Sequence, residues 1–352
     1  MAGLPTTAGM ATRRGRIAAA DAFVVQRLRA AGAVILGKLN MHEAALGATN
    51  DNPHYGRCEH PHHAGYTPGG SSGGSACAVA AGLCALALGS DTMGSVRIPA
   101  AYCGVVGFKA SFGLVSTRGS VACCYALDHI GPLVRSQRDL ALVMPVLAAY
   151  DRECADARDV IARPALAAPR FVVAADIDAL GTTPAVAEAY RSAVRTLRDA
   201  GHAVVAIEVA GYAFSRARRA GLLMVEADLL VEHAADWIGQ PQHFSPELAR
   251  LLRYGEKQSA AAYADAARTV AAAHIEVARW FSHGEVMLLP TAPQQAFRFT
   301  EPVPANQADL TAIANMAGVP SLQLPLPSEG LPIGLQCIAP QGHEATLLGL
   351  KL

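Results

Sequence analysis

The stretch PGGSSGGSACAVAAGLCALALGSDTMGS, Pro68 to Ser95, joins two glycine- and serine-rich turns through a run of small apolar residues. A flexible linker would be followed by a polar or independent segment, but here the first turn runs directly into an apolar segment that indicates a buried helix. A phosphate-binding loop of the G-x-x-x-x-G-K-[ST] type needs a lysine after its glycines, and none follows here. We therefore favour a third interpretation, in which both turns belong to a catalytic site.

The second turn, Asp91 to Ser95, has the composition expected around a serine nucleophile. A sharp turn lets successive backbone N–H groups point to one spot while Ser95 stands at its edge, which is what acyl transfer beside an oxyanion hole requires. Ser71 lies 24 positions earlier. We expect a single helix of about four turns between the two serines, after which the returning chain brings them together.

Helix and strand patterns alternate around this stretch. Apolar residues at helical spacing run from 17 to 31 and stop at Gly32, before a short apolar segment, AVILG at 33–37, that we expect to be a buried strand. The same order recurs in the helical segment 184–201 and the strand-like segment 202–209. Two such units predict an α/β fold. Further expected elements are strands at 170–176 and 285–291, an almost wholly helical region at 211–281, and a surface connection at 151–169.

Composition limits the function classes. The chain has 352 residues, of which 52% are hydrophobic, so it can bury a large core as one large domain or two ordinary ones. Its 29 basic and 29 acidic side chains cancel, which leaves no overall field to attract nucleic acid or an anionic membrane. The longest apolar run, Ala76 to Leu88, is far shorter than the roughly 20 residues that span a bilayer. We predict a cytoplasmic protein with no nucleic-acid or membrane partner.

Neither the cysteines nor the histidines predict a metal site. The eight cysteines form no C-x-x-C pairs, which favours reduced thiols in a cytosolic protein. His60, His62 and His63 have ligand-like spacing but no accompanying carboxylate or cysteine pattern. We favour a solvated loop for these histidines, and we predict no metal and no cofactor.

The block from Pro68 to Gly119 closely resembles the signature of the amidase signature family. The resemblance extends to further motifs and is weakest between about 151 and 285; the motifs are ILGKLNMHEAALG (35–47), LDHIGPLVRS (127–136), VMLLPTAP (286–293) and NMAGVPSLQLPL (315–326). It implies a single α/β domain over residues 1–352, with a mixed, twisted sheet between helices. It also implies a Ser–cis-Ser–Lys site that hydrolyses a carboxylic amide of a small molecule to an acid and ammonia or an amine, without metal or cofactor.

Matched position by position, the resemblance assigns roles to residues of this sequence. Ser95 falls on the nucleophile and Ser71 on the bridging serine, which follows a cis peptide bond after Gly70. The oxyanion hole is implied to consist of the backbone N–H groups of Thr92, Met93, Gly94 and Ser95. A buried neutral lysine would accept the proton of Ser95 through Ser71.

The chain departs from the family at this lysine. The family's lysine lies in a segment resembling VKDNIDVAGLPTTAG, whereas this chain begins MAGLPTTAG. We therefore expect a shortened form of low or no activity, with the lysine segment missing before Met1. The lysines present are Lys38, Lys109, Lys257 and Lys351; for Lys38 and Lys109 we favour structural or surface roles over recruitment as the base.

Other residues near the signature have interpretations of their own. Met93 stands where the family more often has glycine, which predicts a narrower or more apolar acyl pocket. We expect Arg97 and Asp91 to fix the backbone of the nucleophile turn. Asp128 and His129 could line the pocket or form a hydrogen-bonded structural pair.

Two alternatives to a simple amidase remain at this point. One is an amidotransferase A-type subunit, which releases ammonia from glutamine within a multi-subunit complex. The other is a non-catalytic homologue or fragment that binds an amide-bearing ligand without turning it over. A homodimer is also possible.

Overall fold

The computed structural model describes residues 1–351 and is built on an eight-stranded mixed sheet in the order β3-β5-β4-β9-β10-β8-β6-β7. Its strands are β3 (Leu86–Ser90), β4 (Val106–Lys109), β5 (Ile130–Val134), β6 (Phe171–Ala174), β7 (Val204–Ile207), β8 (Val286–Pro290), β9 (Ser321–Leu326) and β10 (Ile333–Ile338). A separate small ribbon pairs β1 (Asp51–Asn52) with β2 (Gly56–Arg57). The α/β fold class with a mixed sheet is thus confirmed.

The sheet has an antiparallel part and a parallel part. From β3 to β8 every neighbouring pair is antiparallel, whereas β6 pairs in parallel with both β8 and β7. Between β6 and β7 the chain crosses over through α5 (Pro184–Asp199), which gives one βαβ unit. The signature block supplies β3 and β4, so it lies in the antiparallel part.

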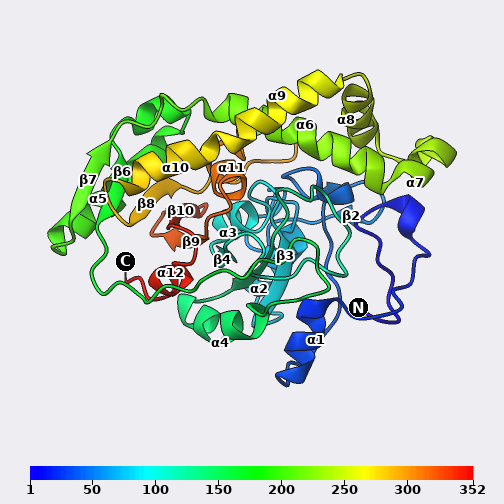
Figure 1. Cartoon of the computed structure of the whole chain (residues 1–352), viewed down its shortest axis with the longest axis horizontal. Coiled ribbons are helices and arrows are strands. Elements are labelled where there is room, and N and C mark those ends of the chain that lie inside the picture. The colour runs from blue at the N-terminus through cyan, green and yellow to red at the C-terminus, as the bar shows by residue number, and fades with distance from the viewer. Residues whose placement is uncertain (352) are drawn as a thin grey trace.

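Helices cover the sheet on its faces and ends (Figure 1). Near the signature they are α1 (Phe23–Ala30), α2 (Gly73–Ala80), α3 (Arg97–Cys103) and α4 (Gln137–Leu147). The long layer at the top of Figure 1 consists of α6 (Phe214–Glu232), α8 (Pro246–Glu256), α9 (Ala260–Ala271) and α10 (Ala273–Phe281), with α7 (Ala234–Gly239) at its end. Two helices near the C-terminus complete the fold, α11 (Asp309–Met316) and α12 (Glu344–Leu348). Four short 3₁₀ turns span Ala11–Arg13, Glu43–Ala45, Ile177–Leu180 and Pro241–His243.

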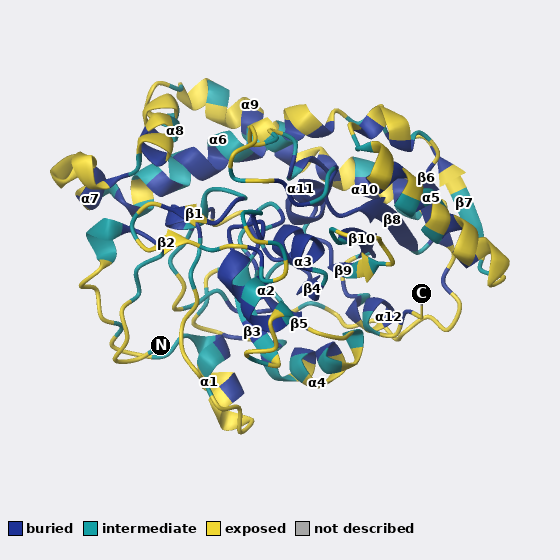
Figure 2. Cartoon of the chain, turned by 180° about the vertical axis from the view of Figure 1, so that it is seen from behind, coloured by how far each residue is buried: buried dark blue, intermediate teal, exposed yellow. Residues whose placement is uncertain are grey.

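The core lies where the sheet meets its helices. All five residues of β8 and all six of β10 are buried, as expected for central strands covered on both faces. Every residue of α11 is buried as well. Figure 2 shows α3, α11 and β8 in the buried interior, whereas the outer helices expose one side to solvent.

The expected four-turn helix between the two serines is wrong. Helix α2 ends at Ala80, Gly82 follows with φ +72°, and Leu86–Ser90 forms β3. Strand β3 pairs with β5 over five residues. An Ala- and Leu-rich run fits a helix and a buried strand equally well, so the pairing with β5 decided between them.

The prediction of a buried strand at 33–37 is also wrong. This segment has no regular secondary structure, and Val34 is 84% and Leu36 74% exposed. The helix before it begins at Phe23 rather than near residue 17 and ends at Ala30 before Gly32, whose φ is +84°.

The remaining expectations for the fold are confirmed. The strands expected at 170–176 and 285–291 are β6 and β8, and the helix expected at 184–201 is α5. The region 211–281 contains five α-helices. The connection 151–169 has no helix or strand and is mostly exposed. No helix within residues 1–351 has both the length and the apolar character needed to cross a bilayer.

Candidate active site

The turn that precedes Ser95 is held from below by the carboxylate of Asp91. One oxygen, Oδ1, accepts the N–H of Gly94 at 2.7 Å, and the other, Oδ2, accepts the N–H of Val96 at 3.2 Å. A short polar side chain that accepts backbone N–H groups a few residues ahead in the chain stabilises a tight turn. Ser95 therefore stands between two residues that are both anchored to Asp91.

Arg97 neutralises this carboxylate in the fully buried interior. Its Nε donates to Oδ2 of Asp91 at 3.0 Å and its Nη2 to Oδ1 at 2.9 Å, and neither side chain is exposed. Burial alone would raise the pKa of Asp91, but the ion pair with Arg97 outweighs burial and holds this pKa well below its usual value. The expectation that Asp91 and Arg97 fix the turn is confirmed.

Helix α11 and strand β10 hold the same arginine from the other side. Nη1 of Arg97 donates to the carbonyl of Thr311 and to Oε1 of Gln336, both at 3.0 Å. Asn315 donates to the backbone carbonyl of Asp91 at 2.7 Å. Segments more than 200 residues apart in sequence thus meet beneath the turn.

Gly94 is required by close packing. Its φ is +131°, and a Cβ built on it would lie 2.2 Å from Oγ1 of Thr311. The Thr311 hydroxyl donates to the carbonyl of Met93 at 2.7 Å. No side chain fits at position 94 without breaking this contact.

Ser71 lies beside the turn, in the interior. Its peptide bond with Gly70 is cis, it has no exposed surface, and its Oγ has no hydrogen-bond partner within the described residues. The next residue connects the two serine segments, because the N–H of Ser72 donates to the carbonyl of Ser95 at 3.2 Å. A buried hydroxyl without a partner is rare in native proteins and calls for an explanation.

Ser72 differs from Ser71 in this respect. Its hydroxyl bonds with both the carbonyl and the N–H of Ser90, each at 3.2 Å, and so joins the start of α2 to the end of β3. The side chain of Ser72 has a structural function, whereas that of Ser71 has none among the described residues.

Three of the four backbone N–H groups assigned to an oxyanion hole are unoccupied. Across residues 1–351, the N–H groups of Thr92, Met93 and Ser95 donate to no protein acceptor. The N–H of Gly94 is already bound to Asp91. The set that the resemblance implied is therefore reduced here to three free donors.

A cavity of about 230 Å³ opens onto Ser95. Thr92, Met93 and Ile98 line one side of it, and the loop 45–48 lines another. This loop lies against the first glycine-rich turn, since a Cβ on Gly70 would lie 2.9 Å from the carbonyl oxygen of Gly47. Met93 therefore does border the space beside the candidate nucleophile.

Helices α6 and α8 close this cavity and bring charge to it. Their lining residues include Arg218, Glu247 and Arg250. Arg218 forms an ion pair with Asp309. Sequence reasoning missed these residues, because they lie in the region where the resemblance is weakest and nothing in their spacing marks them.

No lysine of the described chain reaches the two serines through a hydrogen bond. Nζ of Lys38 donates to the carbonyl of Pro5, and Nζ of Lys109 donates to the carbonyls of Ala110 and Val319. Burial, followed by the charge of Arg97, lowers the pKa of Lys109 well below its usual value. The geometry of Lys109 is that of a structural residue between β4 and the start of β9.

Asp128 and His129 are not hydrogen-bonded to one another, so the expected structural pair is wrong. Asp128 accepts the hydroxyl of Thr92 at 2.6 Å. Nδ1 of His129 lies 2.7 Å from the carbonyl of Leu127, and burial lowers the pKa of this histidine. Neither residue lines the cavity at Ser95.

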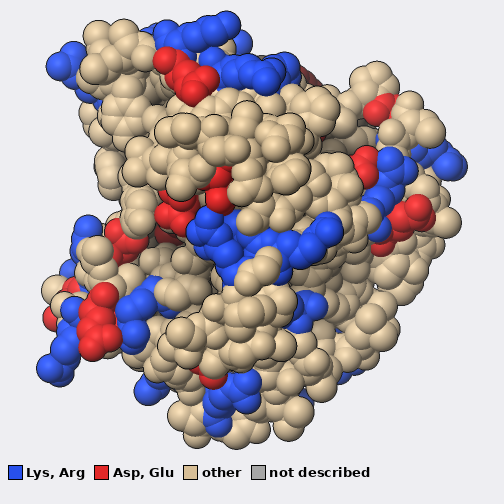
Figure 3. All heavy atoms as spheres, turned by 90° about the vertical axis from the view of Figure 1, so that its right-hand side faces the viewer, with Lys and Arg blue, Asp and Glu red and all other residues tan. Residues whose placement is uncertain are grey.

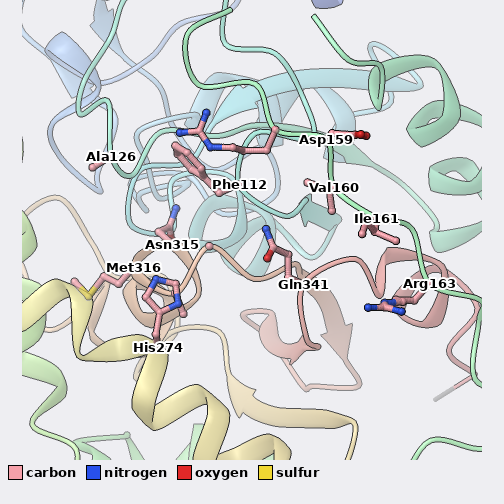
Figure 4. Close-up of a pocket in the computed structure, with 13 residues that line it drawn as sticks. Phe112, Ala126, Asp159, Val160, Ile161, Arg163, His274, Asn315, Met316 and Gln341 are labelled. Carbon is pink, nitrogen blue, oxygen red and sulfur yellow. The ribbon is translucent and has the colours of Figure 1, made fainter.

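A second, larger cavity of about 520 Å³ lies at the other end of α11 (Figure 4). Figure 4 shows Phe112, Asn315, Gln341 and His274 around it, and it contains neither Ser71 nor Ser95. The two cavities lie at opposite ends of α11, because Gln307 and Ala308, just before the helix, line the serine cavity, whereas Asn315 and Met316 at its other end line the larger one. Volume alone does not identify the site of chemistry, which follows from the placement of the serines.

The histidine cluster does not form a metal site. Within residues 1–351, no three His, Cys, Asp or Glu side chains are placed to hold a metal ion. Nε2 of His60 lies 2.8 Å from the carbonyl of Tyr102, and Nε2 of His62 lies 3.3 Å from that of Ala80.

On the face shown in Figure 3, basic and acidic side chains lie next to one another.

Fold and site together define an α/β protein with two serine-bearing turns meeting beneath a small cavity. The family model for amidases, described as "Amidase", matches residues 1–348. The chain therefore belongs to the amidase family.

Similar proteins include enzymes of different named activities. The A-type subunit of glutamyl-tRNA(Gln) amidotransferase from Koribacter versatilis is 34% identical over an alignment that covers 98% of this chain and 80% of the relative. A solved structure from a vestigial protein complex linked to the origin of an s-triazine catabolic enzyme has a TM-score of 0.90 and 34% identity, and covers 99% of this chain and 79% of its own. The structure of 6-aminohexanoate cyclic dimer hydrolase with substrate has a TM-score of 0.87 and 28% identity, and covers 99% and 80%.

Proposed function

We propose that this chain hydrolyses a carboxylic amide through a covalent acyl-enzyme at Ser95. Ser95 Oγ attacks the carbonyl carbon, the C–N bond breaks as ammonia or an amine takes up a proton, and water cleaves the resulting ester to the acid. The free N–H groups of Thr92, Met93 and Ser95 would donate to the oxyanion of the tetrahedral intermediate. The amidase membership supports this reaction class.

The observation that carries the proposal is the buried, unpartnered hydroxyl of Ser71 in the segment that contacts Ser95. A hydroxyl can both accept and donate a proton, so Ser71 is suited to relay the proton of Ser95. A relay functions only if a base lies beyond it. The described residues place no lysine against Ser71, so we expect slow turnover by this chain.

A serine-directed probe tests this assignment directly. A fluorophosphonate should label Ser95, as located by peptide mass spectrometry, and ammonia release from a panel of simple amides should accompany the labelling. Ser95→Ala should abolish both. Undiminished labelling of the Ser95→Ala protein would exclude Ser95 as the nucleophile.

The similarity to the A-type subunits of glutamyl-tRNA(Gln) amidotransferases supports a second candidate. In that function the same serine chemistry would release ammonia from glutamine while the chain is assembled with other subunits. An assay of glutamine against simple amides, with and without candidate partner subunits, separates the two. Binding of an amide without labelling or turnover would instead support a non-catalytic homologue.

A further inference from the structure

Two residues that line the Ser95 cavity are bound to one carboxylate that does not line it. Oδ1 of Asp128 accepts the hydroxyl of Thr92 at 2.6 Å, and Oδ2 accepts the N–H of Cys123 at 2.7 Å. Thr92 and Cys123 both border the Ser95 cavity, whereas Asp128 borders a separate cavity of about 240 Å³ behind them. Asp128 thus forms part of the wall between the two cavities.

The backbone on either side reinforces this link. The N–H of Asp91 donates to the carbonyl of His129 at 2.8 Å, and the N–H of His129 donates to the carbonyl of Asp91 at 3.1 Å. Thr92, which follows Asp91, and Asp128, which precedes His129, are in turn joined through their side chains. Asp91 holds the end of the nucleophile turn at Gly94 and Val96, and the side chain of Thr92 at its start is bound to Asp128.

We propose that Asp128 is a positioning residue that holds Thr92, and with it the free N–H groups of the turn, in the orientation that acyl transfer at Ser95 requires. We call the hydrogen bonds of Asp128 to Thr92 and Cys123 the clamp. The catalytic consequence of this inference rests on the proposed function, but the clamp itself is a property of the fold. A shift of the turn would misdirect the donors, and loss of one such donor typically costs 10²–10³-fold in rate.

The clamp does not depend on the ionisation of Asp128. Burial raises the pKa of Asp128 to about 6, and the hydrogen bond from Thr92 opposes that rise. A proton on Oδ1 would let this oxygen donate to the hydroxyl oxygen of Thr92 while Oδ2 still accepts the N–H of Cys123, so both contacts survive protonation. The clamp therefore holds in both ionisation states of Asp128. The charged and titratable groups on this side of the turn are Arg118, Tyr125, Glu153, Cys154, Asp156, Glu232 and Asp228.

Hydrogen exchange tests the clamp without any need for activity. In Asp128→Ala, the peptide that spans 89–96 should exchange its amide hydrogens at least about tenfold faster than in the parent. Asp176→Ala is the matched control, because Asp176 is also a partly buried carboxylate that accepts two backbone N–H groups, those of Val209 and Ala210. The control should leave exchange at 89–96 unchanged. Unchanged exchange in Asp128→Ala would overturn the proposal.

Asp128→Asn separates hydrogen bonding from overall stability. The amide oxygen can accept from Cys123 while the amide N–H donates to the hydroxyl oxygen of Thr92, so both contacts survive at every pH. We expect parent-like exchange and parent-like fluorophosphonate labelling of Ser95; Asp128→Ala should label at least about tenfold more slowly at pH 7.5. Exchange in Asp128→Asn as fast as in Asp128→Ala would also overturn the clamp. If the parent is not labelled at all, the proposed function fails, and the exchange comparison still decides the clamp.

Discussion

Arg97 and Asp91 form a doubly hydrogen-bonded ion pair with no exposed surface directly beneath the turn that carries Ser95. The pair does more than neutralise a buried charge, because the same carboxylate orients the N–H groups of Gly94 and Val96. Loss of this pair would therefore both destabilise the folded protein and disturb the turn that carries Ser95.

Breaking this pair should be costly. Arg97→Met would leave the Asp91 carboxylate buried without a countercharge, which typically costs 3–5 kcal/mol of unfolding free energy. Arg57→Met is the matched control, since Arg57 pairs with Asp51 where both side chains are 44% exposed, and such a pair contributes about 1 kcal/mol or less. Urea unfolding of both variants measures the difference. Equal losses in the two variants would show that the buried pair is not the structural anchor described here.

Ser71 and Ser72 should respond in opposite ways to substitution. Ser71→Ala removes a hydroxyl without a partner and should leave stability unchanged, yet it should slow labelling of Ser95 by roughly 10²–10⁴-fold where a base accepts the proton beyond Ser71. Ser72→Ala removes two hydrogen bonds to Ser90 and should cost about 1–2 kcal/mol of stability with a smaller effect on labelling. Thermal unfolding and probe kinetics on both variants test this. Parent-like labelling of Ser71→Ala would show that no proton relay operates through Ser71 in this chain.

Gly94→Ala should disrupt the turn. The added Cβ would lie 2.2 Å from Oγ1 of Thr311, and the φ of +131° is unfavourable for any residue with a side chain. We expect loss of Ser95 labelling and a lower melting temperature. Gly15→Ala is the control, because a Cβ there meets nothing within 4 Å. A Gly94→Ala protein with parent-like labelling would mean that the turn tolerates a displacement of Thr311.

Neither Lys38 nor Lys109 should serve as the base. Lys38→Met should leave the labelling rate within about twofold of the parent, because its Nζ is bound to the carbonyl of Pro5. Lys109→Met should reduce stability, since the carbonyls of Ala110 and Val319 lose their buried donor, but the folded protein should still be labelled. A drop of a hundredfold or more in either folded variant would identify that lysine as a recruited base.

Glu226 should make stability depend on pH. It is 1% exposed, its Oε2 lacks a partner within the described residues, and burial raises its pKa to about 7. The pKa of Glu226 is higher in the folded protein than in the unfolded chain, so folding favours the neutral form of this side chain. The stability that results is fully present below about pH 4.5 and is lost as the pH rises through 7. Glu226→Gln should therefore stabilise the protein by about 3 kcal/mol at pH 8 and by little at pH 5. Equal effects at both pH values would show that Glu226 does not titrate in this range.

Local sequence patterns predicted a large part of the fold. Helix α5 and strands β6, β7 and β8 follow from periodicity and from turn residues such as Gly201, whose φ is +85°. The sequence also placed Ser71 and Ser95 in glycine- and serine-rich turns on either side of a compact apolar run. The helix and turn signals depend on contacts within a few residues, so the sequence determined them by itself.

Tertiary contacts decided the rest. The run 76–88 is divided between α2 and β3 because β5, about 45 residues further on, pairs with its second half. The apolar segment 33–37 lies exposed because no strand of the described chain pairs with it. The charged wall of the cavity comes from α6 and α8, and the Gly94 N–H is unavailable because Asp91 accepts it. The periodicity of a sequence indicates which residues can be buried. It does not indicate which distant segment will pack against them or bind them, because such segments come together only when the chain folds.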